Sequence, residues 1–261
     1  MKKYLRKIPV LGPVGDKLAY SFRKASRAVR GKNKAHRYSF RRIGLDDGGS
    51  EFSDRSIKQA VNLLNYTKIS GETYNGGKFP AGYHTLQING VKLLGQRQPS
   101  ERLELTPFDF SNKTVLDIGC NQGGMLFPLS DRIAHGVGID YDSRLVNAAN
   151  KIRSLKNAAN LDFYVFNLEN EDLNLIKDFL PDIKVDIAFL LSVCMWIKNW
   201  KEVIDLAAEV SDHLLFESNG RTEQQAEQIA YLRKRYKSVQ QLSEKSEDDT
   251  SQKNRKLFFC C

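Results

Sequence analysis

The residues best suited to chemistry lie in one stretch, Thr114–Met125, with the sequence TVLDIGCNQGGM. Its apolar run Val115–Ile118 predicts a buried strand, which leads into a glycine-rich turn and then into an apolar segment, Met125–Leu129, that can form a helix. Glycine permits positive φ and lets a ligand approach the backbone closely. Free N–H groups at the start of a helix favour a polar or anionic group. The stretch therefore predicts a ligand-binding turn, and a simple tight turn without a ligand is the alternative.

The spacing of this turn indicates which ligand it would take. Dinucleotide-binding folds use Gly-x-Gly-x-x-Gly, whereas the order here is Asp117-x-Gly119-Cys120-Asn121-x-Gly123. This order resembles the first motif of the class I S-adenosylmethionine (SAM) methyltransferases, Asp/Glu-x-Gly-x-Gly-x-Gly. Asn121 replaces the middle glycine, and asparagine tolerates left-handed backbone better than other non-glycine residues. The resemblance implies that these five residues surround SAM.

A second predicted strand, Gly136–Asp140, follows about 20 residues later. A carboxylate at the end of such a strand accepts hydrogen bonds from ribose hydroxyls, so we expect Asp140 to bind the ribose of the cofactor. The resemblance places the adjacent Tyr141 in the same site. Alternatively, Asp140 or Asp142 caps the helix predicted over Ser143–Arg153.

Two further predicted strands end in polar residues. Phe163–Phe166 is followed by Asn167 and Leu168, which the resemblance places beside the adenine ring, although asparagine after a strand is often a turn residue. The continuous apolar run Val185–Leu191 suits a central parallel strand and is followed by Ser192, which the resemblance places at the reaction site.

The remaining pattern completes an α/β fold. A fifth strand at His213–Phe216, a polar helix at Gln224–Arg235 and two last strands at Val239–Leu242 and Lys256–Cys260 follow in order. The resemblance implies a doubly wound, mostly parallel seven-stranded sheet with a C-terminal antiparallel hairpin. We assign this SAM-binding core to residues 111–261.

Residues 53–110 are expected to form an extension that closes over the cofactor. Ser56–Leu64 has the apolar spacing of a helix. Tyr83–Ile88 and Val91–Leu94 flank Asn89-Gly90, a strong β-hairpin signal. Behind this hairpin, Arg97 or Arg102 could bind the methionine carboxylate of SAM, because arginine is the natural bidentate partner of a carboxylate. Each could also be an ordinary surface arginine.

Residues 1–52 form a basic arm and hinge. The first 42 residues contain 14 Lys or Arg and a single acid, so this part carries +13 and the rest of the chain −4. Lys17–Arg30 has the pattern of a basic amphipathic helix, which favours an anionic membrane surface or, less strongly, nucleic acid. A helix that caps the core with solvated charges is the alternative.

Composition favours a cytoplasmic enzyme, with the arm docked at the inner membrane face as a further option. No run reaches the ~18 apolar residues of a membrane span, and the N-terminus lacks the pattern of a secretory signal. The four cysteines form no Cys-x-x-Cys pair, and no metal-ligand cluster is evident, so we expect reduced thiols and metal-independent chemistry.

The sequence therefore predicts a SAM-dependent methyltransferase acting on a small molecule, a glycan or a lipid-linked acceptor. His84 and Glu217 are candidates for a general base, which is needed only if the nucleophile starts protonated. Three alternatives stay open: an RNA methyltransferase that uses the basic arm, a non-catalytic SAM-binding interaction protein, and a nicotinamide dehydrogenase. The glycine spacing argues against the last.

Overall fold

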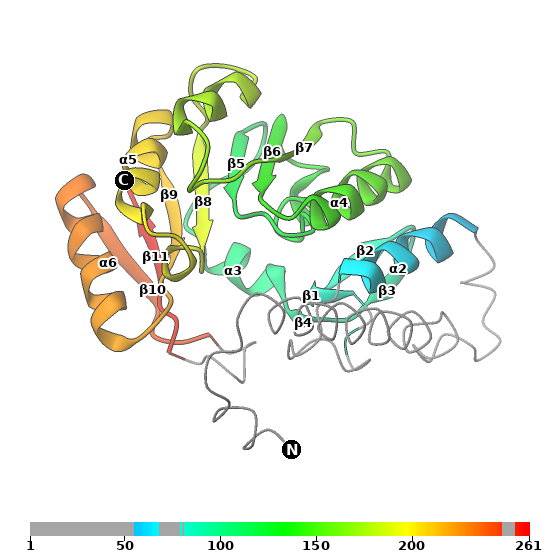
Figure 1. Ribbon diagram of the computed structural model, residues 1–261, viewed down its shortest axis with the longest axis horizontal. Coiled ribbons are helices and arrows are strands. Elements are labelled where there is room, and N and C mark those ends of the chain that lie inside the picture. The colour runs from blue at the N-terminus through cyan, green and yellow to red at the C-terminus, as the bar shows by residue number, and fades with distance from the viewer. Residues whose placement is uncertain (1–54, 68–78, 80, 247–253) are drawn as a thin grey trace, which may run out of the picture.

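The computed structural model describes residues 55–67, 79, 81–246 and 254–261, which fold into an α/β protein (Figure 1). The basic arm predicted at residues 1–52, with its helix at 17–30, lies outside the described residues. Across the described part of the chain, no helix is both long enough and apolar enough to span a membrane.

A seven-stranded sheet forms the centre of the molecule. Its strands are β5 (Thr114–Ile118), β6 (His135–Asp140), β7 (Leu161–Val165), β8 (Ile187–Leu191), β9 (Leu214–Glu217), β10 (Val239–Ser243) and β11 (Leu257–Cys260). The order across the sheet is β10-β11-β9-β8-β5-β6-β7, and β11 runs antiparallel to both of its neighbours. The predicted mostly parallel sheet with a C-terminal antiparallel hairpin is confirmed.

Helices cover both faces of this sheet, so the fold is doubly wound as predicted. Val115 of β5 packs in the same apolar cluster as α4 (Ser143–Lys156) and α2 (Arg55–Thr67). The next residue, Leu116, packs in a second cluster with α5 (Trp200–Val210) and α6 (Thr222–Arg235). Alternating side chains along a strand point to opposite faces, which explains this division. The side chain of Asp117 therefore lies on the same face as Val115.

The helix after β6 begins at a side-chain cap. The Asp142 carboxylate accepts a hydrogen bond from the backbone N–H of Arg144 at 2.9 Å, and Asn157 ends α4 in the left-handed conformation with φ 55°. Of the two acids considered, Asp142 is therefore the N-cap of α4, and aspartate is among the residues preferred at this position.

Replacing Asp142 with alanine is expected to lower the free energy of unfolding by about 1 kcal/mol, because the N–H of Arg144 loses its partner at the helix start. Asp142→Ser keeps a capping oxygen and should recover most of that loss. Urea denaturation followed by circular dichroism measures both changes. Equal stability of the alanine variant and the unchanged protein would contradict the capping role.

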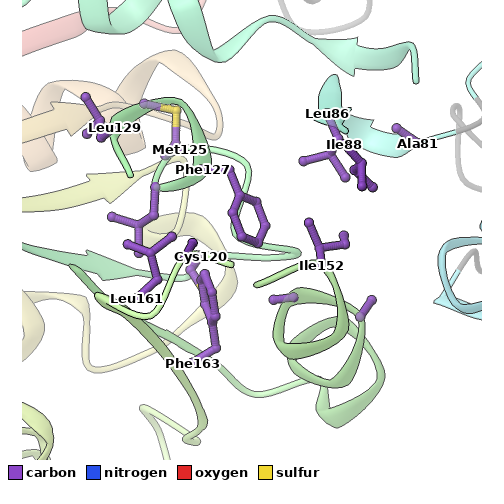
Figure 2. Packing of buried hydrophobic residues seen from close by; sticks show 14 of the residues in the cluster. Ala81, Leu86, Ile88, Cys120, Met125, Phe127, Leu129, Ile152, Leu161 and Phe163 are labelled. Atoms are coloured by element: carbon purple, nitrogen blue, oxygen red, sulfur yellow. The ribbon is translucent and has the colours of Figure 1, made fainter. Parts of the chain in front are cut away.

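The segment after the glycine turn differs from the prediction. Instead of a helix over Met125–Leu129, the chain forms successive turns and a short 3-10 helix, η4 (Phe127–Leu129). Pro128 has no N–H to donate, and Gly123 has φ 79°, so regular α-helix does not form here. Packing fixes the segment instead, since Phe127 lies among Leu86, Ile88 and Ile152 (Figure 2).

The extension ahead of the sheet contains the predicted hairpin. β2 (Leu86–Ile88) pairs with β3 (Val91–Leu93), and both turn residues have positive φ, 48° at Asn89 and 82° at Gly90. The strand expected to start at residue 83 is interrupted at Thr85, whose Oγ1 accepts from the N–H of Gly95 at 2.9 Å.

Two elements of this extension, β4 (Gly95–Arg97) and α3 (Pro99–Leu105), were not predicted, whereas β1 (Gly82–His84) is the first part of the strand expected over Tyr83–Ile88. β1 pairs in parallel with β4, and α3 follows with proline in its first turn. The strands of the extension pair among themselves and stay separate from the main sheet. Two further 3-10 helices, η5 (Leu173–Phe179) and η6 (Cys194–Trp196), belong to the loops around β8.

Candidate functional site

A cavity opens where β5, β8 and β9 end, and the extension covers it. Ligands of open α/β sheets bind at this carboxyl edge. Its lining comes from the main sheet and its loops on one side and from β1 and α3 on the other, namely Tyr83, His84, Arg102, Asp117, Gly119, Met125, Leu191 and Glu217. The structure therefore brings five of the residues selected from the sequence to one cavity: His84, Arg102, Asp117, Gly119 and Glu217.

Asp117 is a buried carboxylate that lines this cavity. Its side chain is 2 % exposed, and its Oδ2 has no hydrogen-bond partner among the described residues. Burial, together with the nearby charge of Asp140, raises the pKa of Asp117 to about 8. A buried carboxylate in this state is stabilised by a positively charged or hydrogen-bond-donating ligand.

Asp140 fixes the glycine turn to the end of β6. Its Oδ2 accepts from the N–H of Asn121 and its Oδ1 from the N–H of Asp142, both at 2.9 Å. Burial raises the pKa of Asp140. The N–H groups of Gly119 and Cys120 donate to the carbonyl of Ile139 on the same strand. Asp140 is thus placed between the turn and the first residues after β6, and its contact with ribose stays a prediction.

The turn requires its unusual backbone. Asn121 has φ 53°, which confirms that asparagine accommodates the left-handed conformation here. Gly119 has φ 81°, and a Cβ at this position would lie 2.5 Å from Cγ2 of Val193. A Cβ on Gly123 would lie 2.7 Å from the ring of Phe163, which Figure 2 shows beneath Cys120. Close packing inside the protein is therefore one reason for these glycines, beside the predicted approach of a ligand.

The predicted adenine side lies at the ends of the neighbouring strands β6 and β7. Tyr141 is 71 % exposed, and Leu168 is buried. The side-chain oxygen of Asn167 accepts from the N–H of Glu169 at 3.0 Å, which is the local turn contact common for asparagine after a strand. The side-chain N–H of Asn199 donates to the carbonyl of Leu168 at 2.6 Å. The role of these residues with adenine stays a prediction.

Glu217 lies at the centre of a buried ionic cluster. Its Oε1 accepts from Nη2 of Arg97 at 2.7 Å and from Nε of Arg102 at 3.1 Å. Its Oε2 accepts from the hydroxyl of Ser192 and lies 3.8 Å from Nη1 of Arg255. We call these five residues the Glu217 cluster. The two arginines considered for the methionine carboxylate thus bind a protein carboxylate in this structure, and their role toward SAM stays a prediction.

His84 also lies in the cavity wall. It is 7 % exposed, and its ring is tilted against that of Tyr83 with 4.7 Å between the centroids. A Cβ added to Gly124 would lie 2.3 Å from Cβ of His84, so the second glycine of the pair makes room for β1. The geometry is compatible with the base role considered for His84 and does not test it.

Several residues of this region were not predicted from the sequence. Tyr83 and Met125 line the cavity, and Gln122 attaches β1 to the turn because its side-chain N–H donates to the carbonyls of Ala81 and His84. Asn219 was also missed: it donates to the carbonyl of Ser192 and accepts from the N–H of Met195 at 3.0 Å. The polar run that follows β9 was the only available signal for Asn219.

Comparisons of sequence agree with the arrangement of the site. Residues 116–214 match the family described as methyltransferase domain. A stretch of 91 residues is 34% identical to the predicted methyltransferase 235L of Invertebrate iridescent virus 6, covering 34% of this chain and 29% of that protein. A second stretch, of 87 residues, is 34% identical to 23S rRNA (uracil(1939)-C(5))-methyltransferase RlmD of Klebsiella pneumoniae (strain 342). It covers 33% of this chain and 19% of that protein. The matches span less than a third of either relative.

Solved structures share the fold. The N-terminal domain of EvdMO1 with S-adenosylhomocysteine (SAH) bound has a TM-score of 0.57 at 13% identity, covering 81% of this chain and 98% of that one. WbdD in complex with a kinase inhibitor has a TM-score of 0.51 at 17% identity, covering 64% and 41%. The strand order and the family match over residues 116–214 together show that this chain carries a methyltransferase domain with the class I, Rossmann-like fold.

Proposed function

We propose that the chain is a SAM-dependent methyltransferase whose methyl donor binds in the cavity beside Asp117. The observation that carries this proposal is the buried Oδ2 of Asp117, which lines the cavity and has no hydrogen-bond partner among the described residues. A cationic ligand would compensate this carboxylate, and SAM is positively charged at both its sulfonium and its ammonium group. The residues present therefore fit the cofactor.

The other candidate residues follow the same edge of the sheet. Asp140 would accept hydrogen bonds from the ribose hydroxyls, and Asn167 and Leu168 would contact adenine. The backbone of the turn from Gly119 to Gly123 would support the part of the cofactor that lies between these contacts. This assignment uses the ends of three adjacent strands, β5, β6 and β7, whose parallel pairing brings them to one side.

The protein's part in the reaction is to position the reactants and exclude water. SAM would supply an activated methyl group, so the cavity needs chiefly to orient it toward the acceptor. His84 in the cavity wall is our candidate for accepting the proton of an acceptor hydroxyl or amine. The covering elements β1 and α3 shield the cavity from solvent.

Removing the Asp140 carboxylate is expected to weaken SAM binding by about 1.5–3 kcal/mol, the scale of a charge-assisted hydrogen bond. The change tested is Asp140→Ala, followed by titration calorimetry with SAH. Asp142→Ala is the control for disorder at the start of α4, because it removes the cap on Arg144 and leaves the N–H groups of residues 121 and 142 bound to Asp140. Unchanged affinity in a folded Asp140→Ala variant would remove the ribose assignment.

For the acceptor we propose a small molecule, a glycan or a lipid-linked compound. RNA is the second candidate, supported by the local similarity to an rRNA methyltransferase and by the basic arm. Transfer of labelled methyl from SAM to fractionated lipid, glycan, small-molecule and RNA pools tests both, with the Asp117→Asn variant as the inactive control. Label in RNA alone would favour the second candidate. SAH binding without label in any pool would favour a non-catalytic SAM-binding protein.

We also propose that the basic arm docks the enzyme on an anionic membrane surface in the cytoplasm. The support is the sequence of residues 17–30, since each basic residue near such a surface contributes about 1 kcal/mol. The full chain should sediment with anionic vesicles at low salt and dissociate at high salt. A chain that starts near Ser53 should lose this binding. Equal sedimentation of both chains would contradict the proposal.

A further inference from the structure

Glu217 connects parts of the chain that lie far apart in sequence. It is 4 % exposed at the end of β9, and its two carboxylate oxygens are divided between different partners. Oε1 accepts from Arg97 of β4 and Arg102 of α3, while Oε2 accepts from Ser192, the residue after β8. One carboxylate thus joins the elements that cover the cavity to the loop that begins at Ser192.

The covering segment, residues 81–105, depends on side chains for its attachment to this edge of the sheet. Its strands pair with one another, whereas its polar links to the main sheet and its loops include Gln122 at one end and Glu217 at the other. Arg97 is fully buried, and its guanidinium also donates to the hydroxyls of Ser246 and Tyr83 at 2.8 and 3.3 Å. Charged hydrogen bonds of this kind are among the strongest that a protein makes.

Ser192 is the second element that Glu217 holds. Its φ is 60°, an uncommon conformation for a residue other than glycine, and such conformations persist only where the surroundings enforce them. Glu217 accepts from the hydroxyl of Ser192 with Oε2 and from its N–H with the main-chain carbonyl at 3.0 Å. The next residue, Val193, packs against Gly119 of the turn. The backbone at Ser192 therefore sets the space beside the turn.

We infer that Glu217 is a positioning residue: it holds the covering segment closed over the cavity and at the same time fixes the Ser192 loop for transfer. This inference rests on the proposed methyltransferase function and reassigns Glu217 from the general-base role considered from the sequence. Two guanidinium groups donate to Oε1 and the Ser192 hydroxyl donates to Oε2, so both oxygens of this carboxylate are already bound by protein groups. The same side chain then holds both the covering segment and the Ser192 loop in place.

The test is Glu217→Gln, which keeps the size of the side chain and removes its charge. Hydrogen exchange of the amides in residues 81–105 should accelerate at least tenfold, and SAH affinity by calorimetry should fall at least tenfold. The pH profile of kcat should keep its shape, because a positioning residue takes no part in proton transfer. Asp186→Asn is the matched control: this carboxylate binds Lys113 and the N–H of Thr114 at the opposite edge of the sheet, and its loss should change none of these readouts.

Arg97→Gln keeps the inference testable if Glu217→Gln fails to fold. Arg97 does not line the cavity, and its removal leaves Glu217 bound to Arg102 and Ser192. The variant should again accelerate exchange in residues 81–105 and weaken SAH binding. Unchanged exchange in the folded variants, or loss of one limb of the pH profile with SAH affinity intact, would overturn the inference. If the unchanged protein binds no SAH, the proposed function fails. In that case the hydrogen-exchange rates of residues 81–105 alone test whether Glu217 holds the covering segment in place.

Discussion

Asp117→Asn is expected to weaken SAM binding about 100-fold and, in the free protein, to raise the free energy of unfolding above neutral pH. The first effect follows from the loss of a negative charge on a buried side chain that lines the cavity, since a hydrogen bond to a charged group contributes about 1.5–3 kcal/mol. The second follows from the cost of that same charge when no ligand compensates it.

The direction of the pH dependence follows from the raised pKa. Burial, with the nearby Asp140, raises the pKa of Asp117 to about 8, against about 3.9 in an unfolded chain. The folded state therefore holds the proton more tightly, and the stability this provides is present at acidic pH and is lost as the pH rises from about 4 to 8. The Asp117→Asn variant has no carboxyl group to titrate at this position, so its free energy of unfolding should fall less between about pH 6 and pH 8.5.

The same pKa predicts how binding responds to pH. A cationic ligand favours the charged form of Asp117, so SAM affinity should rise by up to about tenfold per pH unit between pH 6 and pH 8. Calorimetry at several pH values, with urea denaturation of both proteins, measures both effects. Asp186→Asn again provides a carboxylate control outside the cavity. Equal SAM affinity of Asp117→Asn and the unchanged protein would show that this carboxylate does not face the ligand.

Gly119→Val should eliminate SAM binding and lower the free energy of unfolding by about 2–6 kcal/mol. A side chain at φ 81° is strained by about 1–3 kcal/mol, and overpacking adds a similar amount because the new Cβ would lie 2.5 Å from Cγ2 of Val193. At low temperature the variant should still show a native circular dichroism spectrum. Binding is lost because the valine occupies the space between the turn and the Ser192 loop.

The change Val193→Ala separates the two contributions to this loss of stability, namely the backbone strain at residue 119 and the collision with Val193. In the double variant Gly119→Ala with Val193→Ala, the collision with Val193 is removed while the strain at φ 81° remains. Its free energy of unfolding should therefore exceed that of Gly119→Val, and SAH titration shows whether the cavity is restored. Normal SAM binding by a folded Gly119→Val variant would mean that the turn is not part of the cofactor site.

Local sequence patterns were sufficient for most of the sheet. The run IAFLL of β8 is apolar on both faces because it lies in the centre of the sheet, and such a run is visible without a structure. Asn89-Gly90 identified the hairpin because its two-residue turn requires positive φ at both positions. Asp117 was found because it precedes the glycine turn at the spacing that the methyltransferase motif uses.

The remaining features depend on contacts between distant residues. Glu217 and Arg97 are 120 positions apart, so no local pattern showed that two candidate ligand residues bind each other. The short helix α3 starts at Pro99 and carries Glu101 and Arg102, and its length gives too little periodicity to detect. The turns that replace the helix after Gly124 depend on the packing of Phe127 against β2 and α4.

The cavity beside Asp117 is expected to bind the methyl donor. Titration calorimetry of the full chain with SAH, repeated with NAD, tests it most directly. We expect saturable binding of one SAH per chain, competitive with SAM, and no binding of NAD. Absence of SAH binding by the folded protein, or equal binding of NAD, would contradict it.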